Sequence, residues 1–421
     1  MTSPALCIKI IPSILDVPAA QWDACANPSS FHDVSEPSAG PGRDLQVAPQ
    51  VDRTKAQQAP YNPFISHDFL SSLELSKSVS ARAGWQPQHL VIARDDGTVD
   101  AVAPTYLKSH SRGEYVFDRG WAEAYERAGG NYYPKLQVAV PFTPATGRRL
   151  LVRPGPQADP MRTALAAGLV ALCRQREASS VHVTFLPDDE WDHLGQQGFL
   201  QRTDRQFHWY NADYASFDDF LAALAARKRK VIRRERRDAM ASDISLHWLT
   251  GSDLTESVWD AFFAFYMETG SRKWGRPYLT REFYSIVGER MADRILLVMA
   301  KRAGRWIAGA INFIGSDTLF GRHWGAIEHH PFLHFEVCYY QAMEYAIAHR
   351  LACVEAGAQG EHKLSRGYLP KTTYSAHYIA DPALRRAIAD YLKRERVYVD
   401  ADVEELEACA PFRKDLTVDA D

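Results

Sequence analysis

Apolar residues recur along this chain in two patterns, at helical spacing and in short continuous runs. Pro160–Arg176 has the spacing of an amphipathic helix, and the run Ser180–Leu186 that follows it predicts a buried strand. Asp95-Asp96-Gly97 separates two apolar runs and predicts a hairpin turn. Because strands and helices interleave from one end of the chain to the other, we expect a mixed α/β fold.

The second half contains the densest group of polar residues. A strand is expected at Leu319–Gly325, a helix at Phe335–His349 and a strand at Ala352–Ala356. The last strand leads into the loop EAGAQGEHKLSRGYLP, which is rich in ionisable side chains and glycine. Loops at strand ends present side chains from a rigid scaffold, so we expect the main site here.

The length of 421 residues predicts two domains. We place an N-terminal domain at 1–212 and a C-terminal domain that carries the main site at 213–398. Residues 27–60 are dominated by Pro, Ser, Gln, Asp and Gly and are expected to be a flexible insertion. Residues 399–421 form an acidic tail that we expect to be frayed.

Composition and charge narrow the class of protein. A hydrophobic content of 46% with 24% charged residues is typical of a globular protein, and the net charge of -3 argues against a sequence-specific nucleic-acid binder. No apolar run is long enough to predict a membrane span. The six cysteines form no C-x-x-C pair, which favours reduced thiols and a cytoplasmic location.

The stretch Phe217–Ala241 is strongly basic and has one apolar side, so we expect a single helix. It is either a solvated basic surface or a surface that grips the phosphates of a polyanionic donor. The candidate phosphate-binding residues are Arg229, Lys230, Arg233, Arg234 and Arg237.

Two of these stretches resemble a known family. R-K-R-K-V-I-R-R-E-R-R resembles the basic helix of Fem-type peptidyl transferases, and GRHWGAIE followed by VEAGAQGEHKLSRGY resembles their strand, helix, strand and glycine-rich loop. NPFISHDFL, GWQPQHL and NYYPKLQVAVPFTP are similar to FemAB-like N-acyltransferases of bacteria. The resemblance covers Tyr61–Arg396. It implies two tandem GNAT-like acyltransferase domains. It also implies transfer of an acyl or aminoacyl group to an amine, and a peptidoglycan-related amine or a small-molecule amine is a possible acceptor.

The donor implied by the resemblance is acyl-CoA or aminoacyl-tRNA, with no tightly bound cofactor and no metal. Acyl-CoA enzymes of the GNAT fold hold the pyrophosphate on the backbone N–H groups of a glycine-rich loop. This chain has Ala326-Ile327-Glu328-His329-His330-Pro331 at the corresponding place. The departure leaves open an unusual mode of CoA binding or a different donor.

Acyl transfer to an amine requires removal of a proton, stabilisation of an oxyanion and alignment of the reactants. The first set of candidates supplies acids and bases: Glu361, His362, Glu355, His323 and Tyr368. Glu361 and His362 are preferred as the base because they lie in the loop, while Glu355 could instead be a structural carboxylate. The second set would bind the substrates or donate to the oxyanion: Arg322, Trp324, Glu336, Tyr339, Tyr340, Gln359, Lys363 and Arg366.

Two other classes of function compete with acyl transfer. Histidines and glutamates of this region could form a metal site, although the sequence shows no H-E-x-x-H or similarly tight ligand spacing. The chain could also be a non-catalytic module that recognises a cell-wall peptide, which the altered phosphate loop favours. The many ionisable groups of the Glu355–Tyr368 loop argue against that alternative.

Overall fold

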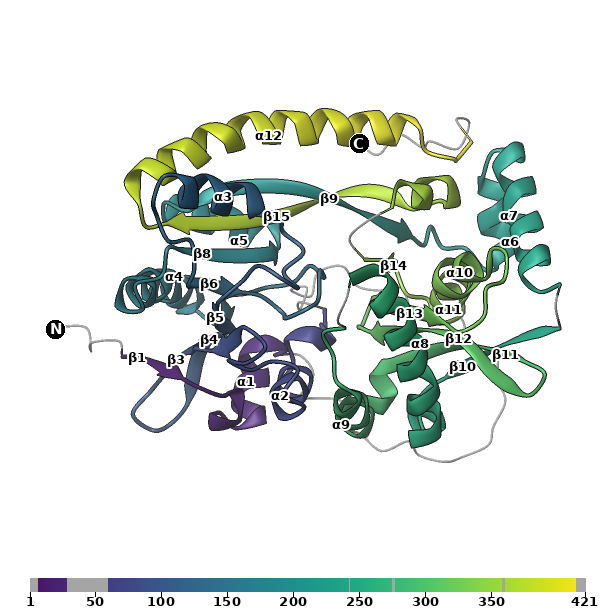
Figure 1. Cartoon of the computed structure of the whole chain (residues 1–421), viewed down its shortest axis with the longest axis horizontal. Coiled ribbons are helices and arrows are strands. Elements are labelled where there is room, and N and C mark those ends of the chain that lie inside the picture. Colours follow the sequence, from purple (N-terminus) through teal and green to yellow (C-terminus); the bar gives the residue numbers. More distant parts are fainter. Residues whose placement is uncertain (1–6, 29–59, 242, 275–276, 358–359, 414–421) are drawn as a thin grey trace.

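The computed structural model describes residues 7–28, 60–241, 243–274, 277–357 and 360–413. Within these residues the fold is mixed α/β, which confirms the predicted fold class (Figure 1). The insertion predicted at 27–60 falls almost wholly on residues outside the described ranges, and so does Gln359. Glu361 lies in a described segment, but its side chain is not described.

The described strands form two sheets. The smaller has the order β1-β3-β4-β7, and the larger has the order β10-β11-β12-β13-β14-β9-β15-β8-β6-β5-β2. The strands are β1 Ile8–Ile11, β2 Trp85–Pro87, β3 His89–Ala93, β4 Val99–Ala103, β5 Thr105–Lys108, β6 Lys135–Val138, β7 Leu151–Val152, β8 Ser180–Leu186, β9 Leu200–Tyr210, β10 Ile244–Leu249, β11 Ile295–Arg302, β12 Arg305–Ile314, β13 Thr318–Ala326, β14 Cys353–Glu355 and β15 Leu369–Ile379.

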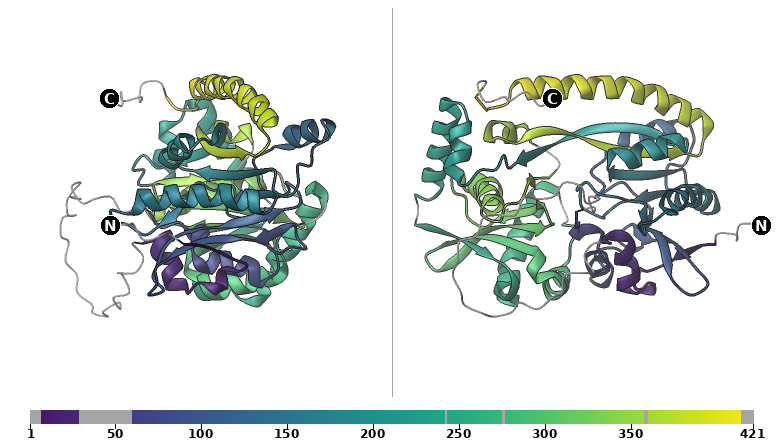
Figure 2. Two further views of the ribbon diagram at one scale, coloured as in Figure 1. Left: turned by 90° about the vertical axis from the view of Figure 1, so that its left-hand side faces the viewer. Right: turned by 180° about the vertical axis from the view of Figure 1, so that it is seen from behind.

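Helices cover the faces of these sheets (Figures 1 and 2). They are α1 Ala19–Ala26, α2 His67–Leu75, α3 Arg119–Arg127, α4 Ala158–Gln175, α5 Asp188–Gln196, α6 Phe217–Ala223, α7 Ala226–Ala239, α8 Glu256–Trp274, α9 Arg281–Met291, α10 Leu333–Phe335, α11 Gln341–Ala348 and α12 Pro382–Ala408. A π-helical turn, Glu336–Tyr340, joins α10 to α11, and a 3-10 helix spans Glu361–Arg366.

Two long strands join the halves of the molecule. β9 pairs with β14 of the second half at one end and with β15 along most of its length. β15, although it comes late in the chain, lies between β9 and β8 of the first half. Figure 1 shows β9 and β15 running together beneath α12, which packs on both. One sheet therefore passes through both halves.

Two predictions about helices were wrong in their boundaries. The helix expected over Phe217–Ala241 is broken at Leu224, whose backbone is extended and forms a bridge with Phe412, and the N–H of Ala225 bonds to the carbonyl of Pro411. The expected frayed tail is instead helical as far as Ala408, because α12 continues and buries Val399. In both cases a distant segment supplies the partner.

β13 and β14 separate soon after they meet, and this opening positions the site. Their parallel pairing covers only Thr318–Phe320 against Cys353–Glu355, and β13 then continues without β14. β13 also bulges against β12, because Arg322 and His323 lie opposite the single residue Ile311. A bulge of this kind redirects side chains, so adjacent residues can face the same space.

Candidate functional site

A cavity of about 670 Å³ lies between the two halves of the molecule. The segment between β5 and α3 forms one wall, and α8, β13 and α10 form the other. The residues that line it are His110, Ser111, Arg112, Gly113, Tyr115, Phe117, Asp118, Arg119, Tyr133, Tyr266, Thr269, Gly270, Pro277, Tyr278, Arg322, His323, Trp324 and His334. Its size is that of a site for a small organic ligand.

Three predicted site residues, Arg322, His323 and Trp324, line this cavity from β13. A guanidinium nitrogen of Arg322 donates to the carbonyl of Phe142 in the first half. The His323 ring packs edge-on against Tyr266 with ring centroids 5.0 Å apart. Burial, assisted by the charge of Arg322, lowers the pKa of His323 to about 3. The imidazole is therefore neutral at physiological pH.

Glu355 is buried at the end of β14, directly beside Phe320 of β13. Burial raises the pKa of this carboxyl to about 8, against the opposing effects of the Thr146 amide and the arginines Arg322 and Arg149. Its Oε2 atom has no hydrogen-bond partner among the described residues. Glu355 is therefore mainly protonated at neutral pH, which weakens the prediction that it acts as a base there.

A second group of predicted residues gathers around Glu235 of α7. Arg366 donates two hydrogen bonds to the Glu235 carboxylate, with Nη2 2.7 Å from Oε1 and Nε 3.2 Å from Oε2. The Tyr340 hydroxyl donates to the same carboxylate. Arg366 also lies over the ring of Phe335, 3.4 Å from its centroid. These side chains hold the 3-10 helix Glu361–Arg366 against α7.

Other predicted loop residues are also engaged in internal contacts. Lys363 is buried and donates to the carbonyls of Ala356 and Gly357, at 2.8 and 2.9 Å. Burial lowers the pKa of Lys363 to about 8. Tyr368 is fully buried, and its hydroxyl has no partner among the described residues. The hydroxyl of Tyr339 lies 3.0 Å from Nε2 of His362.

Glu336 has a structural partner that the sequence did not reveal. Arg236 of α7 forms ion pairs with both Glu336 and Glu344, with nitrogen–oxygen distances of 2.9 and 2.8 Å. Arg236 was counted only among the basic residues of this stretch, and Glu235 was not singled out. The available signal was the spacing of Glu235, three residues after the buried Ile232, which places an acid on the apolar face of a basic helix.

A row of rings connects the cavity to this second group. His334 packs against Trp324 on one side and against Tyr339 on the other, with ring centroids 5.2 and 5.4 Å apart. His362 follows, 5.8 Å from Tyr339. The two groups of predicted residues are therefore neighbours, although only the first lines the cavity.

The predicted phosphate-binding side chains lie on the outward face of α7. Lys230, Arg233, Arg234 and Arg237 are exposed, and Arg229 is half-buried. Arg233 contacts Asp218 at 3.2 Å, and Asp238 contacts Arg234 and Arg237 at 4.0 and 2.9 Å. α7 itself packs on α10, the π turn and the 3-10 helix. A net positive surface thus lies next to the outer end of the row of rings.

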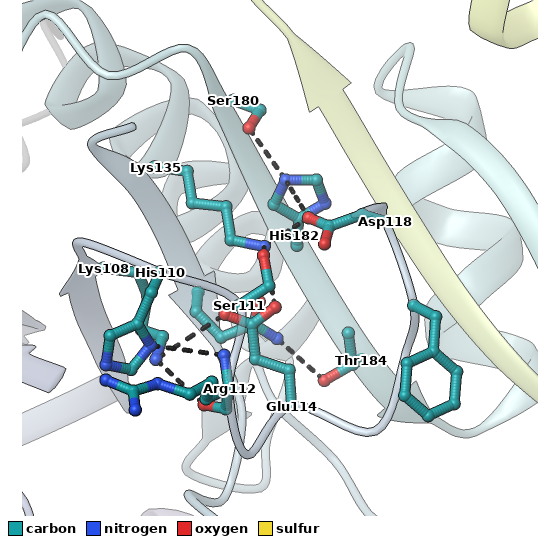
Figure 3. A network of polar contacts seen from close by, with 12 residues as sticks. Lys108, His110, Ser111, Arg112, Glu114, Asp118, Lys135, Ser180, His182 and Thr184 are labelled. Carbon is teal, nitrogen blue, oxygen red and sulfur yellow. Dashed lines mark hydrogen bonds and ion pairs between the residues drawn. The ribbon is translucent and has the colours of Figure 1, made fainter. Parts of the chain in front are cut away.

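A buried ionic cluster in the first half supports the opposite wall of the cavity (Figure 3). Nζ of Lys135 donates to Ser111 at 2.8 Å, to Glu114 at 2.7 Å and to Asp118. Lys108 lies 3.6 Å from Glu114 and donates to the carbonyl of Arg112 at 3.3 Å. Sequence reasoning missed this cluster, since its members come from two strands and the loop between β5 and α3.

Two further observations concern the alternatives. In the described ranges, no three or more His, Cys, Asp and Glu side chains are grouped so that they could hold a metal ion. None of the helices in the described part of the chain is both long enough and apolar enough to cross a membrane.

The solved structures that are similar to this chain include three of low identity. FemX is 11% identical with a TM-score of 0.46, covering 75% of this chain and 93% of FemX. A tandem GNAT protein from the clavulanic acid biosynthesis pathway is 14% identical with a TM-score of 0.45, covering 90% and 99%. L-PGS from Bacillus licheniformis is 8% identical with a TM-score of 0.45, covering 76% and 95%.

Among curated proteins no match was found. The family model FemAB_like, described as peptidoglycan biosynthesis/recognition, matches residues 13–414 and so covers far more than half of the chain. This match agrees with the family that the sequence motifs resemble. The chain belongs to the FemAB-like family of peptidoglycan biosynthesis and recognition.

Proposed function

We propose that this protein is a transferase that moves an acyl or aminoacyl group to an amine in the central cavity. The observation that carries the proposal is the position of His323, a neutral imidazole on a bulge of β13 that lines a cavity walled by both halves. Membership of a family described by peptidoglycan biosynthesis supports a peptidoglycan-related amine as the acceptor.

The chemistry needs one proton acceptor and a site sheltered from water. The lone pair of the acceptor amine attacks the carbonyl carbon of the activated ester and forms a tetrahedral intermediate. His323 accepts the proton that the amine loses, and the intermediate collapses to the amide. The leaving thiol or hydroxyl then takes up a proton. The imidazole is neutral before the reaction, but a general base works best with a pKa near the operating pH, so transfer requires the pKa of His323 to rise from about 3 once the substrates are bound.

The donor is expected to be acyl-CoA or aminoacyl-tRNA, with its phosphates on the outward face of α7. The reactive end would pass along the rings of His334 and Trp324 into the cavity, because these rings connect the two regions. The catalytic roles predicted for Glu361, His362 and Tyr368 stay predictions. Lys363 and Arg366 are already bonded to internal acceptors, so they are poorer candidates for oxyanion donors.

The test is a transfer assay with the purified protein. Radiolabelled acetyl-CoA or aminoacyl-tRNA is incubated with peptidoglycan precursors and simple amines, and the amide product is identified by mass spectrometry. His323→Gln is expected to lower turnover by about 100-fold, the usual contribution of a general base, while the melting temperature is retained. His247→Gln on the edge strand β10 is the matched control and should keep full activity. Full activity of His323→Gln would remove its assigned role.

The non-catalytic binding module is a second candidate that one observation favours. The ionisable loop residues that argued against it are partly accounted for by structural contacts, above all the Arg366–Glu235 pair. Binding of a peptidoglycan fragment without transfer from any tested donor would support this alternative over the transferase.

A further inference from the structure

The central cavity carries positive charge that the protein does not balance. Arg322 and Arg112 line it, and neither forms an ion pair with any residue that the structure describes. Arg119 also lines it but is paired with Glu123, with Nε 2.7 Å from Oε1. Asp118 is the one acid among the described lining residues. Its carboxylate already accepts hydrogen bonds from Lys135 and from the hydroxyl of Tyr132.

The environment of Arg322 is that of a receptor for an anion. Its side chain is half-buried, and its hydrogen-bond partners are the carbonyl of Phe142 and the hydroxyl of Tyr115, neither of them a carboxylate. Burial lowers the pKa of Arg322, which is the sign of a cation held where its charge is poorly solvated. Glu355, the acid whose charge would act on Arg322, is mainly protonated at neutral pH. A desolvated guanidinium with free N–H groups gains most from a bound oxyanion.

Arg112 lines the same cavity, and residues of the network in Figure 3 hold its backbone in place. Its carbonyl accepts from Lys108 at 3.3 Å and from the Trp85 indole at 3.2 Å, and its N–H bonds to His110. The side chain itself is exposed. A rigid backbone with an exposed guanidinium suits it to draw an anion toward Arg322.

We propose that Arg322, assisted by Arg112, binds a carboxylate of the acceptor, so that the acceptor is an amino acid or a short peptide with both an amine and a carboxylate. A single guanidinium that already bonds the Phe142 carbonyl and the Tyr115 hydroxyl matches a planar, singly charged carboxylate better than a phosphate dianion. Because the bulge brings Arg322 and His323 to one wall, a carboxylate on Arg322 places a nearby amine beside His323. This assignment rests on the proposed function for the role of the amine, but not for the binding of the carboxylate.

The test measures binding and needs no turnover. Saturation-transfer NMR on the full chain compares alanine and alanyl-alanine with their C-terminal amides, and includes inorganic phosphate as a separate probe. The acids are expected to bind at least about tenfold more tightly than the amides, as loss of a charge-assisted contact implies. Arg322→Met should abolish the preference, and Arg112→Gln should reduce it. Arg119→Gln, at the paired arginine of the same cavity, should leave it unchanged.

Several outcomes would overturn the assignment. One is equal binding of acids and amides, and another is no binding of either at concentrations up to about 50 mM. The others are binding of phosphate alone and an unchanged preference in Arg322→Met. If Arg322→Met does not fold, the exposed variant Arg112→Gln decides the question. A carboxylate preference without any acyl transfer would keep the subsite and reject the transferase, so the two proposals can fail separately.

Discussion

The carboxylate of Glu235 and the guanidinium of Arg366 form a buried two-point contact between α7 and the 3-10 helix Glu361–Arg366, with Nη2 2.7 Å from Oε1. These residues are 131 positions apart in the sequence. Their side chains are 6% and 8% exposed, so each depends on the other for compensation of its charge.

Removal of one member of this pair should be costly. Glu235→Ala leaves Arg366 buried without a counter-charge and also removes the acceptor of the Tyr340 hydroxyl, so we expect the free energy of unfolding to fall by about 3–5 kcal/mol. Urea denaturation measures the change. Asp218→Asn breaks the exposed contact with Arg233 and should cost less than about 1 kcal/mol. Similar small effects of both variants would contradict the buried pair.

Glu355 should make stability depend on pH. Its pKa is about 8 in the folded protein against an ordinary value of 4.5. Below pH 4.5 the group is protonated in both states and has no effect. Between these values the unfolded chain releases the proton that the folded protein retains, so stability falls as pH rises and levels off above pH 8.

Glu355→Gln removes this dependence, since glutamine does not titrate. The variant should match the wild type near pH 4 and be more stable by about 1–4 kcal/mol at pH 8–9. Thermal or urea unfolding across this pH range tests the difference, with Glu289→Gln at an exposed position as the control. A variant that is less stable than the wild type at high pH would show that the carboxyl is ionised in the fold.

The outward face of α7 should contribute to donor binding if it holds phosphates. Arg233→Glu combined with Arg234→Glu is expected to weaken binding of aminoacyl-tRNA or acetyl-CoA by about tenfold or more at low salt, and by less as salt screens the charges. Binding titrations over a range of salt concentrations measure this. Arg386→Glu with Arg394→Glu makes the same charge change on exposed positions of α12 and should have little effect. Equal donor affinity in both double variants would exclude a role for α7.

Gly325 permits the close contact between β13 and α8. A Cβ atom at this position would overlap the backbone carbonyl of Phe265, so Gly325→Ala must push α8 away from the strand. We expect a loss of about 1–3 kcal/mol and weaker ligand binding, because Tyr266 of α8 lines the cavity. Calorimetry and ligand titration measure the two effects. Gly120→Ala in α3, where an added Cβ meets nothing within 4 Å, should be neutral or slightly stabilising.

Much of the local structure and the family could be predicted from the sequence. The periodicity of apolar residues gave the mixed α/β class, and the hairpin at Asp95-Asp96-Gly97 appears as β3 and β4. Arg322, His323 and Trp324, which the sequence placed at the end of a strand, line one wall of the cavity. These features depend on residues close together in the chain, so a linear pattern records them.

Tertiary structure alone decided the rest. The break at Leu224 depends on Phe412. The place of β15 depends on its pairing with β8 and β9, which come much earlier in the chain. The opposite cavity wall depends on Lys135. The bulge that turns Arg322 and His323 toward one space is a matter of register with β12. Local pattern fixes which residues can form a strand or carry charge, but pairing across the chain determines which side chains meet and which charges remain uncompensated.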